Sequence, residues 1–341
     1  MVNKALKPSI AIIGAGLAGL SCATQLQAKG FKVKIFEKSR GPSGRMSTRN
    51  GDNWSADHGA QYFTARDPLF LEELNTWIKD GVADAWHPLL KVFEDGQWRE
   101  CTSIERRYVG IPAMNCPGKY LAKNLKVQYS QTIDEIACNA GKWTLHSLED
   151  GSVDEQFDWL ALAIPAPQAF TLTNLINKSI TEKNAVKMQG CWTVVASFNE
   201  KQDIPFDAAF INGEIISWIS RNNSKPGREG LETWIIHANP QWSQQWIELG
   251  KEETGKRILK CAKRLDIDFQ DAQISVHRWR YASGSIGANP GFKVDDAIQL
   301  GLCGDWLHSG RVEGAWLSGY KLANEISIQQ AHFTQNQDLL A

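Results

Sequence analysis

The chain has 341 residues, with 37 basic and 38 acidic side chains and a formal net charge of −1. These charges are not segregated along the chain, so nothing indicates nucleic acid or an anionic membrane as a partner. No apolar stretch approaches the roughly 18–20 residues of a membrane span. The seven cysteines are scattered and form no C-x-x-C pair, which predicts a cytoplasmic protein with reduced thiols, no metal site and no disulfide framework.

The first forty residues predict a strand, a glycine-rich turn, a helix and a second strand. Apolar residues 10–13 form the first strand, residues 17–29 suit a helix, and apolar residues alternate over 31–35. The turn reads G-x-G-x-x-G from Gly14, and the second strand ends at Glu37. A strand–turn–helix–strand unit with an acid about 20 residues past the turn is typical of dinucleotide binding.

Each part of this pattern has a physical role in holding an ADP group. Gly14 makes the tight turn, Gly16 lets backbone approach a pyrophosphate, and Gly19 lets the helix lie close to the strand. The helix N-terminus offers free N–H groups and the positive end of its dipole to the anion. Glu37 is expected to accept hydrogen bonds from both ribose hydroxyls. The alternative is a glycine-rich turn that binds nothing.

Two later segments are interpreted as returns of the chain to the same sheet. Residues 156–165 form an apolar strand stopped by a proline. Residues 298–305 form another strand, and a helical run follows over about 313–329. Continuous apolar runs of this kind suit a buried parallel sheet.

The sequence between these returns has a different pattern. Residues 185–220 and 231–238 contain alternating stretches that suit an antiparallel sheet, and residues 242–265 are helical in pattern. The chain is therefore predicted to be an α/β protein with a discontinuous nucleotide-binding domain and an inserted domain of antiparallel strands plus helices. The predicted boundaries are 1–65, 120–165 and 291–341 for the nucleotide-binding domain, and 66–119 and 166–290 for the substrate-binding domain.

Two further segments carry candidate cofactor contacts. Arg45 follows a glycine-rich loop, where it could clamp a pyrophosphate through two hydrogen bonds or remain a solvated loop charge. Asp305, after Gly304 at a strand end, could bind a ribityl hydroxyl. Small residues on the next helix (Gly314, Ala315 and Gly319) would allow a flat ring to approach, with the helix dipole favouring negative charge on that ring. Contacts this widely separated suit the long FAD molecule better than NAD.

On these residues the chain resembles the flavin-containing amine oxidase superfamily, and within it the bacterial renalases. The resemblance rests on the turn from Gly14, on Ser43-Gly44-Arg45-Met46, on Asp57-x-Gly59-Ala60-Gln61-Tyr62 and on Gly304-Asp305. It implies an FAD-binding domain of the p-hydroxybenzoate hydroxylase or monoamine oxidase type. The motifs and the resemblance together predict a set of cofactor-binding residues. These are Gly14, Ala15, Gly16, Ala18, Gly19, Glu37, Lys38, Arg45, Gly59, Gln61, Tyr62, Ile133, Gly304, Asp305 and Gly314.

Two details qualify the resemblance. Pro42-Ser43 stands where a second glycine is common in the superfamily, which affects the path of the loop before Arg45. No cysteine occurs between Cys261 and Cys303, the segment that carries a covalent flavin thioether in some amine oxidases. The FAD is therefore expected to be non-covalent.

The resemblance also implies a reaction. Renalases oxidise the 2- and 6-dihydro isomers of NAD(P)H to NAD(P)⁺ by hydride transfer to flavin N5, and dioxygen is then reduced to hydrogen peroxide. The expected partners are therefore a small-molecule substrate and dioxygen, and no protein partner can be inferred. Three alternatives stay open: an amine oxidase of a small amine or polyamine, a flavin hydroxylase that needs NADPH, and a flavin-binding sensor without turnover.

The residues proposed to act on substrate are His237, Trp279 and Arg280. His237 is expected to face the flavin and hydrogen-bond the substrate or the flavin edge, unless it is a satisfied core residue. Alternation over 277–281 places Arg280 on one strand face and Trp279 on the other. Arg280 could hold the pyrophosphate of a dinucleotide or be a solvated charge, and Trp279 could be a platform for substrate.

Overall fold

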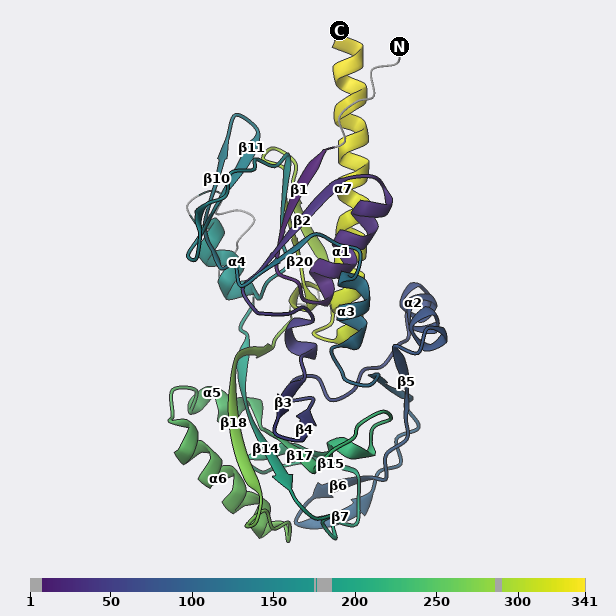
Figure 1. Ribbon diagram of the computed structural model, residues 1–341, viewed down its shortest axis with the longest axis vertical. Helices are drawn as coiled ribbons and strands as arrows, with labels where there is room; N and C mark the ends of the chain where they lie inside the picture. Colours follow the sequence, from purple (N-terminus) through teal and green to yellow (C-terminus); the bar gives the residue numbers. More distant parts are fainter. Residues whose placement is uncertain (1–7, 175, 177–185, 286–289, 341) are drawn as a thin grey trace. The chain divides into compact units, whose positions relative to one another are not determined.

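The computed structural model describes residues 8–174, 176, 186–285 and 290–340 (Figure 1). The chain divides into two compact units, each built from separated pieces of sequence. Unit 1 comprises Met1–Gly44, Gly118–Lys187 and Ser285–Ala341, and unit 2 comprises Arg45–Pro117 and Met188–Gly284.

Unit 1 is built on a six-stranded sheet with the order β19-β20-β13-β1-β2-β9. Neighbouring strands pair in parallel, except that β19 and β20 are antiparallel. The central strands are buried, which explains their continuous apolar sequences, and the predicted returns of the chain at 156–165 and 298–305 are confirmed. The strands are Ser9–Ile13 (β1), Lys32–Glu37 (β2), Val127–Tyr129 (β9), Trp159–Leu162 (β13), Phe292–Asp295 (β19) and Leu300–Cys303 (β20).

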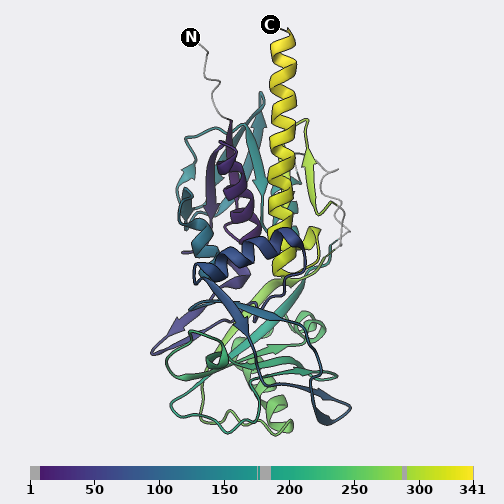
Figure 2. The same cartoon turned by 90° about the vertical axis from the view of Figure 1, so that its right-hand side faces the viewer.

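Two helices of unit 1, α1 (Leu17–Ala28) and α7 (Val312–Leu340), lie side by side along this sheet (Figures 1 and 2). The Ser21 hydroxyl on α1 donates a hydrogen bond to the Trp316 carbonyl on α7 at 2.9 Å. No helix in the described part of the chain is both long enough and apolar enough to cross a membrane. The other elements are α3 (Cys116–Ala122), α4 (Ala166–Thr173), η3 (Asp305–Leu307) and a small sheet of β10 (Ile133–Asn139), β11 (Lys142–Ser147) and β12 (Gly151–Ser152).

Unit 2 contains a seven-stranded sheet with the order β18-β14-β17-β16-β15-β6-β7. All of its neighbours are antiparallel except β15 and β6, as the alternating sequence predicts. The strands are Leu90–Glu94 (β6), Gln97–Glu100 (β7), Gln189–Phe198 (β14), Ala208–Ile211 (β15), Ile216–Arg221 (β16), Glu232–Ala238 (β17) and Gln273–Ser283 (β18).

The two faces of this sheet have different coverings. Helix α6 (Lys251–Arg264) packs Ile258 and Cys261 against one face, in a core that includes Trp234 and Ile236. On the other face, Ala56 packs against the sheet. The remaining elements of unit 2 are η1 (Gly44–Met46), β3 (Arg49–Gly51), β4 (Trp54–Ala56), α2 (Pro68–Lys79), β5 (Ala83–Trp86), β8 (Arg107–Gly110), η2 (Asn222–Ser224) and α5 (Pro240–Gln245).

The structure places the division of the chain differently from the predicted boundaries. Residues 45–65, expected in the nucleotide-binding domain, belong to unit 2. Tertiary contacts explain this difference. Ala56 packs on Val195 and Ile235, and Asp57 forms ion pairs with Lys225 and Arg228, which lie far along the chain. Residues 166–187, expected in the substrate domain, fall instead in unit 1.

Candidate active site

The glycine-rich turn of unit 1 leaves room for an anion beside its backbone. Gly14 has φ +104°, and a Cβ there would lie 2.6 Å from the Ala163 carbonyl oxygen, so glycine is required. At Gly16, which caps α1, no atom lies within 4 Å of the place where a Cβ would stand. No side chain caps this helix end. A pyrophosphate bound there would meet open backbone N–H groups, as the predicted cofactor requires.

Glu37 is fixed at the tip of β2. Its carboxylate accepts hydrogen bonds from the backbone N–H of Ala15 at 2.7 Å and of Ser39 at 2.8 Å. The side chain is buried, yet each carboxylate oxygen keeps a second lone pair for a ribose hydroxyl. The neighbouring Lys38 is exposed, and Ile133 is buried at the start of β10. Glu37 therefore fits the ribose of an ADP group.

The second predicted contact region in unit 1 lies after β20. Asp305 is buried there, and the N–H of Gly304 donates to the Ser318 hydroxyl of α7 at 2.8 Å. A Cβ on Gly314 would stand 2.3 Å from the Ser309 hydroxyl oxygen, so Gly314 is accounted for by local packing. α7 thus holds the turn that carries Asp305.

The sequence predicts that Gly319 leaves room for a flat ring, and the structure corrects this expectation. A Cβ at Gly319 would lie 2.0 Å from the carbonyl oxygen of Ala18 and 3.0 Å from the backbone nitrogen of Cys22, both on α1. The glycine is therefore needed for the contact between α1 and α7. Ala18 is buried at the same contact.

In unit 2 the loop that follows Arg45 folds back on itself. Arg45 donates from Nη1 to the Ala282 carbonyl at 3.0 Å, and its own carbonyl accepts from the Ala60 N–H at 2.9 Å. A Cβ on Gly59 would stand 2.0 Å from the Arg45 carbonyl oxygen, so this turn requires glycine. These contacts and the glycine turn define the path of the loop.

A buried ion cluster holds the residues after this loop. Asp57 Oδ2 accepts from Lys225 Nζ at 3.3 Å and from Arg228 Nη2 at 2.6 Å, and Oδ1 accepts from Thr48 and from the Met114 N–H. Burial alone would raise the pKa of Asp57, but the two cations and these hydrogen bonds outweigh it and lower the pKa to about 2. Burial also lowers the pKa of Lys225, to about 8.

The predicted flavin contact Gln61 is part of the same cluster. Its amide nitrogen donates to the carbonyls of Asp57 and Gly59, and its amide oxygen accepts from the Ser220 hydroxyl at 2.8 Å and from Lys225 at 3.2 Å. The whole side-chain amide is therefore occupied by protein groups. Lys225 and Arg228 were not identified from the sequence, because they lie in a turn-rich stretch where charges are usually solvated.

Two of the three predicted catalytic residues lie together on the sheet face away from α6. In the strand register, His237 of β17 and His277 of β18 both lie opposite Thr193 of β14. Trp279 lies two residues further along β18. The N–H of its indole and His237 Nε2 both hydrogen-bond the His58 carbonyl, at 3.1 and 3.2 Å.

His58 and His277 complete a histidine cluster that the sequence did not predict. The His58 ring stacks on Trp279, with centroids 5.0 Å apart, and contacts His277 edge-on at 4.7 Å. His58 Nδ1 is buried and has no hydrogen-bond partner among the described residues. A lone histidine after Asp57 gives no local signal, so only the folded register could have identified it.

The imidazoles of this cluster are neutral at neutral pH. Burial is the largest cause that lowers the pKa of His58, His237 and His277, each to about 4. The positive charge of Arg49 further lowers the pKa of His58 and of His277. Because His237 Nε2 faces a carbonyl, Nε2 carries the proton and Nδ1 of the neutral ring is an acceptor.

Acid should therefore destabilise the protein through this cluster. The folded-state pKa values near 4 lie below the ordinary value of 6.5, so the unfolded state binds more protons as the pH falls from 6.5 to 4. The free energy of unfolding therefore decreases over this pH range. Replacing His58 with Asn should make that decrease smaller by up to about 3 kcal/mol. The measurement is urea unfolding across that pH range.

The matched control for this prediction is His146, a partly exposed histidine of unit 1 that is hydrogen-bonded to Asp134 at 2.8 Å. That hydrogen bond raises the pKa of His146, so its contribution to stability is present below pH 6.5 and lost as the pH rises. His146→Asn should not flatten the loss in acid. An equal effect of both substitutions would contradict the assignment of neutral imidazoles.

Arg280 does not join the cluster. Its guanidinium donates two hydrogen bonds to Glu248, at 2.5 and 3.0 Å, and 46% of the side chain is exposed. Arg278 binds the same carboxylate at 3.0 Å, so both arginines lie on one strand face, as the alternation predicts. The structure thus shows Arg280 in a partly exposed ion pair, and its role as a substrate clamp stays a prediction.

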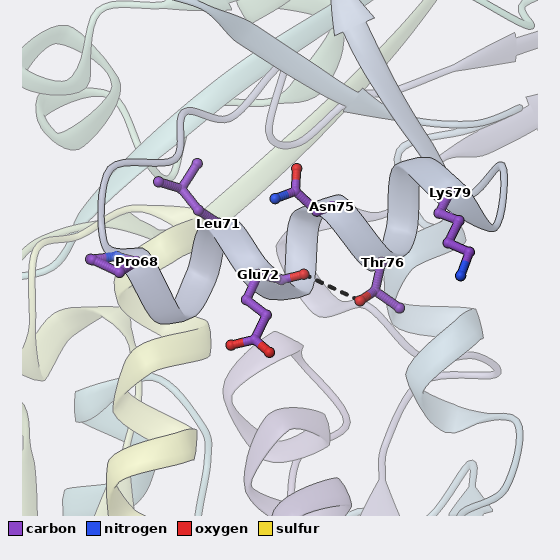
Figure 3. Close-up of a pocket in the computed structure, with 6 residues that line it drawn as sticks. All are labelled: Pro68, Leu71, Glu72, Asn75, Thr76 and Lys79. Atoms are coloured by element: carbon purple, nitrogen blue, oxygen red, sulfur yellow. Dashed lines mark hydrogen bonds between the residues drawn. The ribbon is translucent and has the colours of Figure 1, made fainter.

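A hollow of about 490 Å³ lies along α2 (Figure 3). None of the predicted site residues lines it, and its lining contains no cluster of buried polar groups. The lining residues are Pro68, Leu71, Glu72, Asn75, Thr76 and Lys79.

Two family models match the chain. The NAD(P)-binding Rossmann-like domain matches residues 12–74, and the flavin containing amine oxidoreductase model matches residues 83–327. The second match covers well over half of the sequence. The chain therefore belongs to the flavin containing amine oxidoreductases, and its cofactor is FAD. The open backbone at Gly16 and the fixed carboxylate of Glu37 fit the ADP half of that cofactor.

Solved structures share the fold over almost the whole chain. A protein from Exiguobacterium sp. assigned as a protoporphyrinogen oxidase has a TM-score of 0.76 at 11% identity, over 95% of this chain and 99% of that one. Cyclohexylamine oxidase from Brevibacterium oxydans has a TM-score of 0.73 at 14% identity, over 96% of this chain and 100% of that one. At such identities the likeness concerns the fold alone.

The sequence match to a carotenoid desaturase covers only a short stretch. A 4,4'-diapophytoene desaturase of Staphylococcus haemolyticus is 48% identical over 87 residues, which are 25% of this chain and 17% of that enzyme. The match thus spans less than a fifth of the desaturase.

Proposed function

We propose that this chain is an oxidase of the renalase type, which acts in the cytoplasm on the 2- and 6-dihydro isomers of NAD(P)H. The products are NAD(P)⁺ and hydrogen peroxide. Non-covalently bound FAD would accept the hydride at N5 and pass the electrons to dioxygen. A dihydropyridine is already electron-rich and becomes a cation without losing a ring proton to a base, so the chain's residues must orient it and exclude water.

The observation that carries this proposal is the charge around the aromatic residues of unit 2. An amine substrate would call for rings or a carboxylate that accept a cation. Here Arg107 already lies over the Tyr62 ring at 5.3 Å, and Lys225 over the Trp86 ring at 5.6 Å. Asp57 already accepts hydrogen bonds at both of its oxygens. The site therefore favours a neutral ring that carries negative groups over a small amine or polyamine.

The histidine cluster suits the same substrate. The acceptor Nδ1 of neutral His237 can take a hydrogen bond from a carboxamide N–H, which fixes the orientation of a nicotinamide ring. The neutral imidazoles add no positive charge that would oppose formation of the pyridinium product. His237 is thus proposed to orient the substrate rather than to transfer a proton.

Anaerobic mixing tests this function directly. The FAD-loaded protein should lose its yellow absorbance on adding one equivalent of 6-dihydro-NAD and should keep it with putrescine, cyclohexylamine or other amines. Readmitted air should restore the colour and yield one equivalent of hydrogen peroxide. Bleaching by an amine but not by the dinucleotide would overturn the proposal in favour of an amine oxidase. Bleaching by neither would leave a flavin-binding sensor.

A further inference from the structure

An aromatic cluster in unit 2 lies beside a buried cation, Arg107, whose guanidinium carbon is 5.3 Å from the centroid of the Tyr62 ring. The cluster consists of Tyr62, Trp86 and Trp218, with the Tyr62 centroid 6.2 Å from Trp86 and 5.5 Å from Trp218. Trp86 of β5 lies directly opposite Arg107 of β8 in the antiparallel register. Tyr62 is half-buried, whereas Trp86, Trp218 and Arg107 are almost fully buried.

Arg107 has only neutral partners within the described part of the chain. Its side chain donates to the Glu105 carbonyl at 3.0 Å and to the Ser103 hydroxyl at 3.1 Å. The Glu105 carboxylate is engaged instead by Arg66. The Nε–H of Arg107 has no hydrogen-bond partner among the described residues, although the residue is only 6% exposed. A buried guanidinium without a counter-charge is costly, so an anion there would be strongly favoured.

A second unused donor belongs to the same cluster. The indole N–H of Trp218 is buried and has no partner in the described part of the chain. Lys225 adds positive charge beside Trp86, but its three protons already face Asp57, Gln61 and Asn222. The cluster therefore combines a positive field with two free donors, and it reaches solvent at Tyr62.

We propose that Arg107 and Trp218 form a subsite for an oxyanion of the substrate, and that this oxyanion is a nucleotide phosphate. The guanidinium supplies a charge-assisted hydrogen bond from Nε, and the indole supplies a neutral one. This inference rests on the proposed function for the phosphate source, since a dihydronicotinamide nucleotide carries one. A ring carboxylate would satisfy the same donors, and the experiment separates the two.

Titration calorimetry on the FAD-loaded protein tests the subsite without requiring turnover. The probes are nicotinamide mononucleotide, nicotinamide riboside, which lacks the phosphate, and nicotinate, which carries a ring carboxylate. The mononucleotide should bind about tenfold or more tighter than the riboside. Arg107→Gln should bring that ratio close to one and leave riboside affinity unchanged, and Arg107→Lys should retain part of it.

The matched control is Arg280→Gln, which removes an arginine from the exposed pair with Glu248 and should preserve the ratio. If Arg107→Gln does not fold, Trp218→Phe removes the second donor and keeps a ring, and should lower the ratio severalfold. The subsite would be overturned if the unsubstituted protein bound the mononucleotide and the riboside equally well. It would also be overturned if both variants kept the preference for the mononucleotide. Preference for nicotinate over the mononucleotide would overturn phosphate as the ligand.

The outcome is separable from that of the proposed function. If the protein does not oxidise 6-dihydro-NAD, but Arg107→Gln abolishes its preference for the mononucleotide, the subsite is supported and the proposed reaction is wrong. If the protein oxidises 6-dihydro-NAD and Arg107→Gln does not change its preference for the mononucleotide, the reaction is supported and the subsite is wrong.

Discussion

Replacing Asp57 with asparagine is expected to lower the free energy of unfolding by about 3–5 kcal/mol near neutral pH. Asp57 is fully buried, and its carboxylate is the counter-charge of two buried cations, Lys225 and Arg228. Asparagine is similar in size but carries no charge, so both cations would be left without their partner. Urea unfolding measures the loss.

The pH dependence of this loss follows from Lys225. Its pKa of about 8 already lies below the ordinary value, and removal of the Asp57 charge must lower it further. The folded Asp57→Asn variant then loses the Lys225 proton at a lower pH than the folded unsubstituted protein does. The unfolded chain still binds this proton at that pH. Between these two folded-state pKa values of Lys225, the free energy of unfolding of the variant therefore rises with pH, whereas that of the unsubstituted protein does not. The gap between the two should be narrower near pH 9 than near pH 6.5.

Two further variants test the assignment. Adding Lys225→Met to Asp57→Asn removes one unpaired charge and should recover part of the stability. Glu248→Gln breaks the exposed pairs with Arg278 and Arg280, and should cost less than about 1 kcal/mol because exposed pairs contribute little. A loss below about 1 kcal/mol for Asp57→Asn would mean that the buried ion cluster does not stabilise the fold.

The fold could be predicted from the sequence where the pattern is local. The strand, turn and helix around Gly14, and the acid at Glu37, lie within one continuous segment, and the structure has them where the pattern predicts. The boundary near residue 45 could not be found in this way. It depends on contacts between Asp57 and residues 225–228, and no local pattern marks a loop that pairs with another loop so far along the chain.

The candidate site shows the same difference. Alternation along β18 correctly separates Trp279 from Arg280, but it does not say which face lies away from α6. His58 reaches the cluster only because its carbonyl meets His237 and Trp279 after the strands have paired. No local pattern marks Arg107, because a charged residue is ordinarily solvated, whereas here its partner strand buries it beside Trp86.

Replacing Gly319 with alanine is expected to destabilise the protein even when no FAD is bound. The added Cβ would meet the Ala18 carbonyl oxygen at 2.0 Å and the Ala18 carbonyl carbon at 2.9 Å, and neither backbone atom can move without shifting α1. Separation of α1 from α7 would also lengthen the hydrogen bond from Ser21 to the Trp316 carbonyl. Overpacking of this kind costs about 1–3 kcal/mol, which thermal unfolding of the flavin-free protein would detect.

Gly16→Ala provides the opposite result and so separates packing from cofactor binding. No atom lies within 4 Å of a Cβ at Gly16, and its φ of −72° suits alanine, so the flavin-free protein should keep its stability. FAD should nevertheless bind more weakly, because the methyl group would occupy the approach to the pyrophosphate. Gly319→Ala should instead lower stability first, and lose FAD only as α1 shifts. If Gly319→Ala left the flavin-free protein intact and impaired FAD binding alone, Gly319 would border the flavin after all, and the helix contact would tolerate the extra carbon.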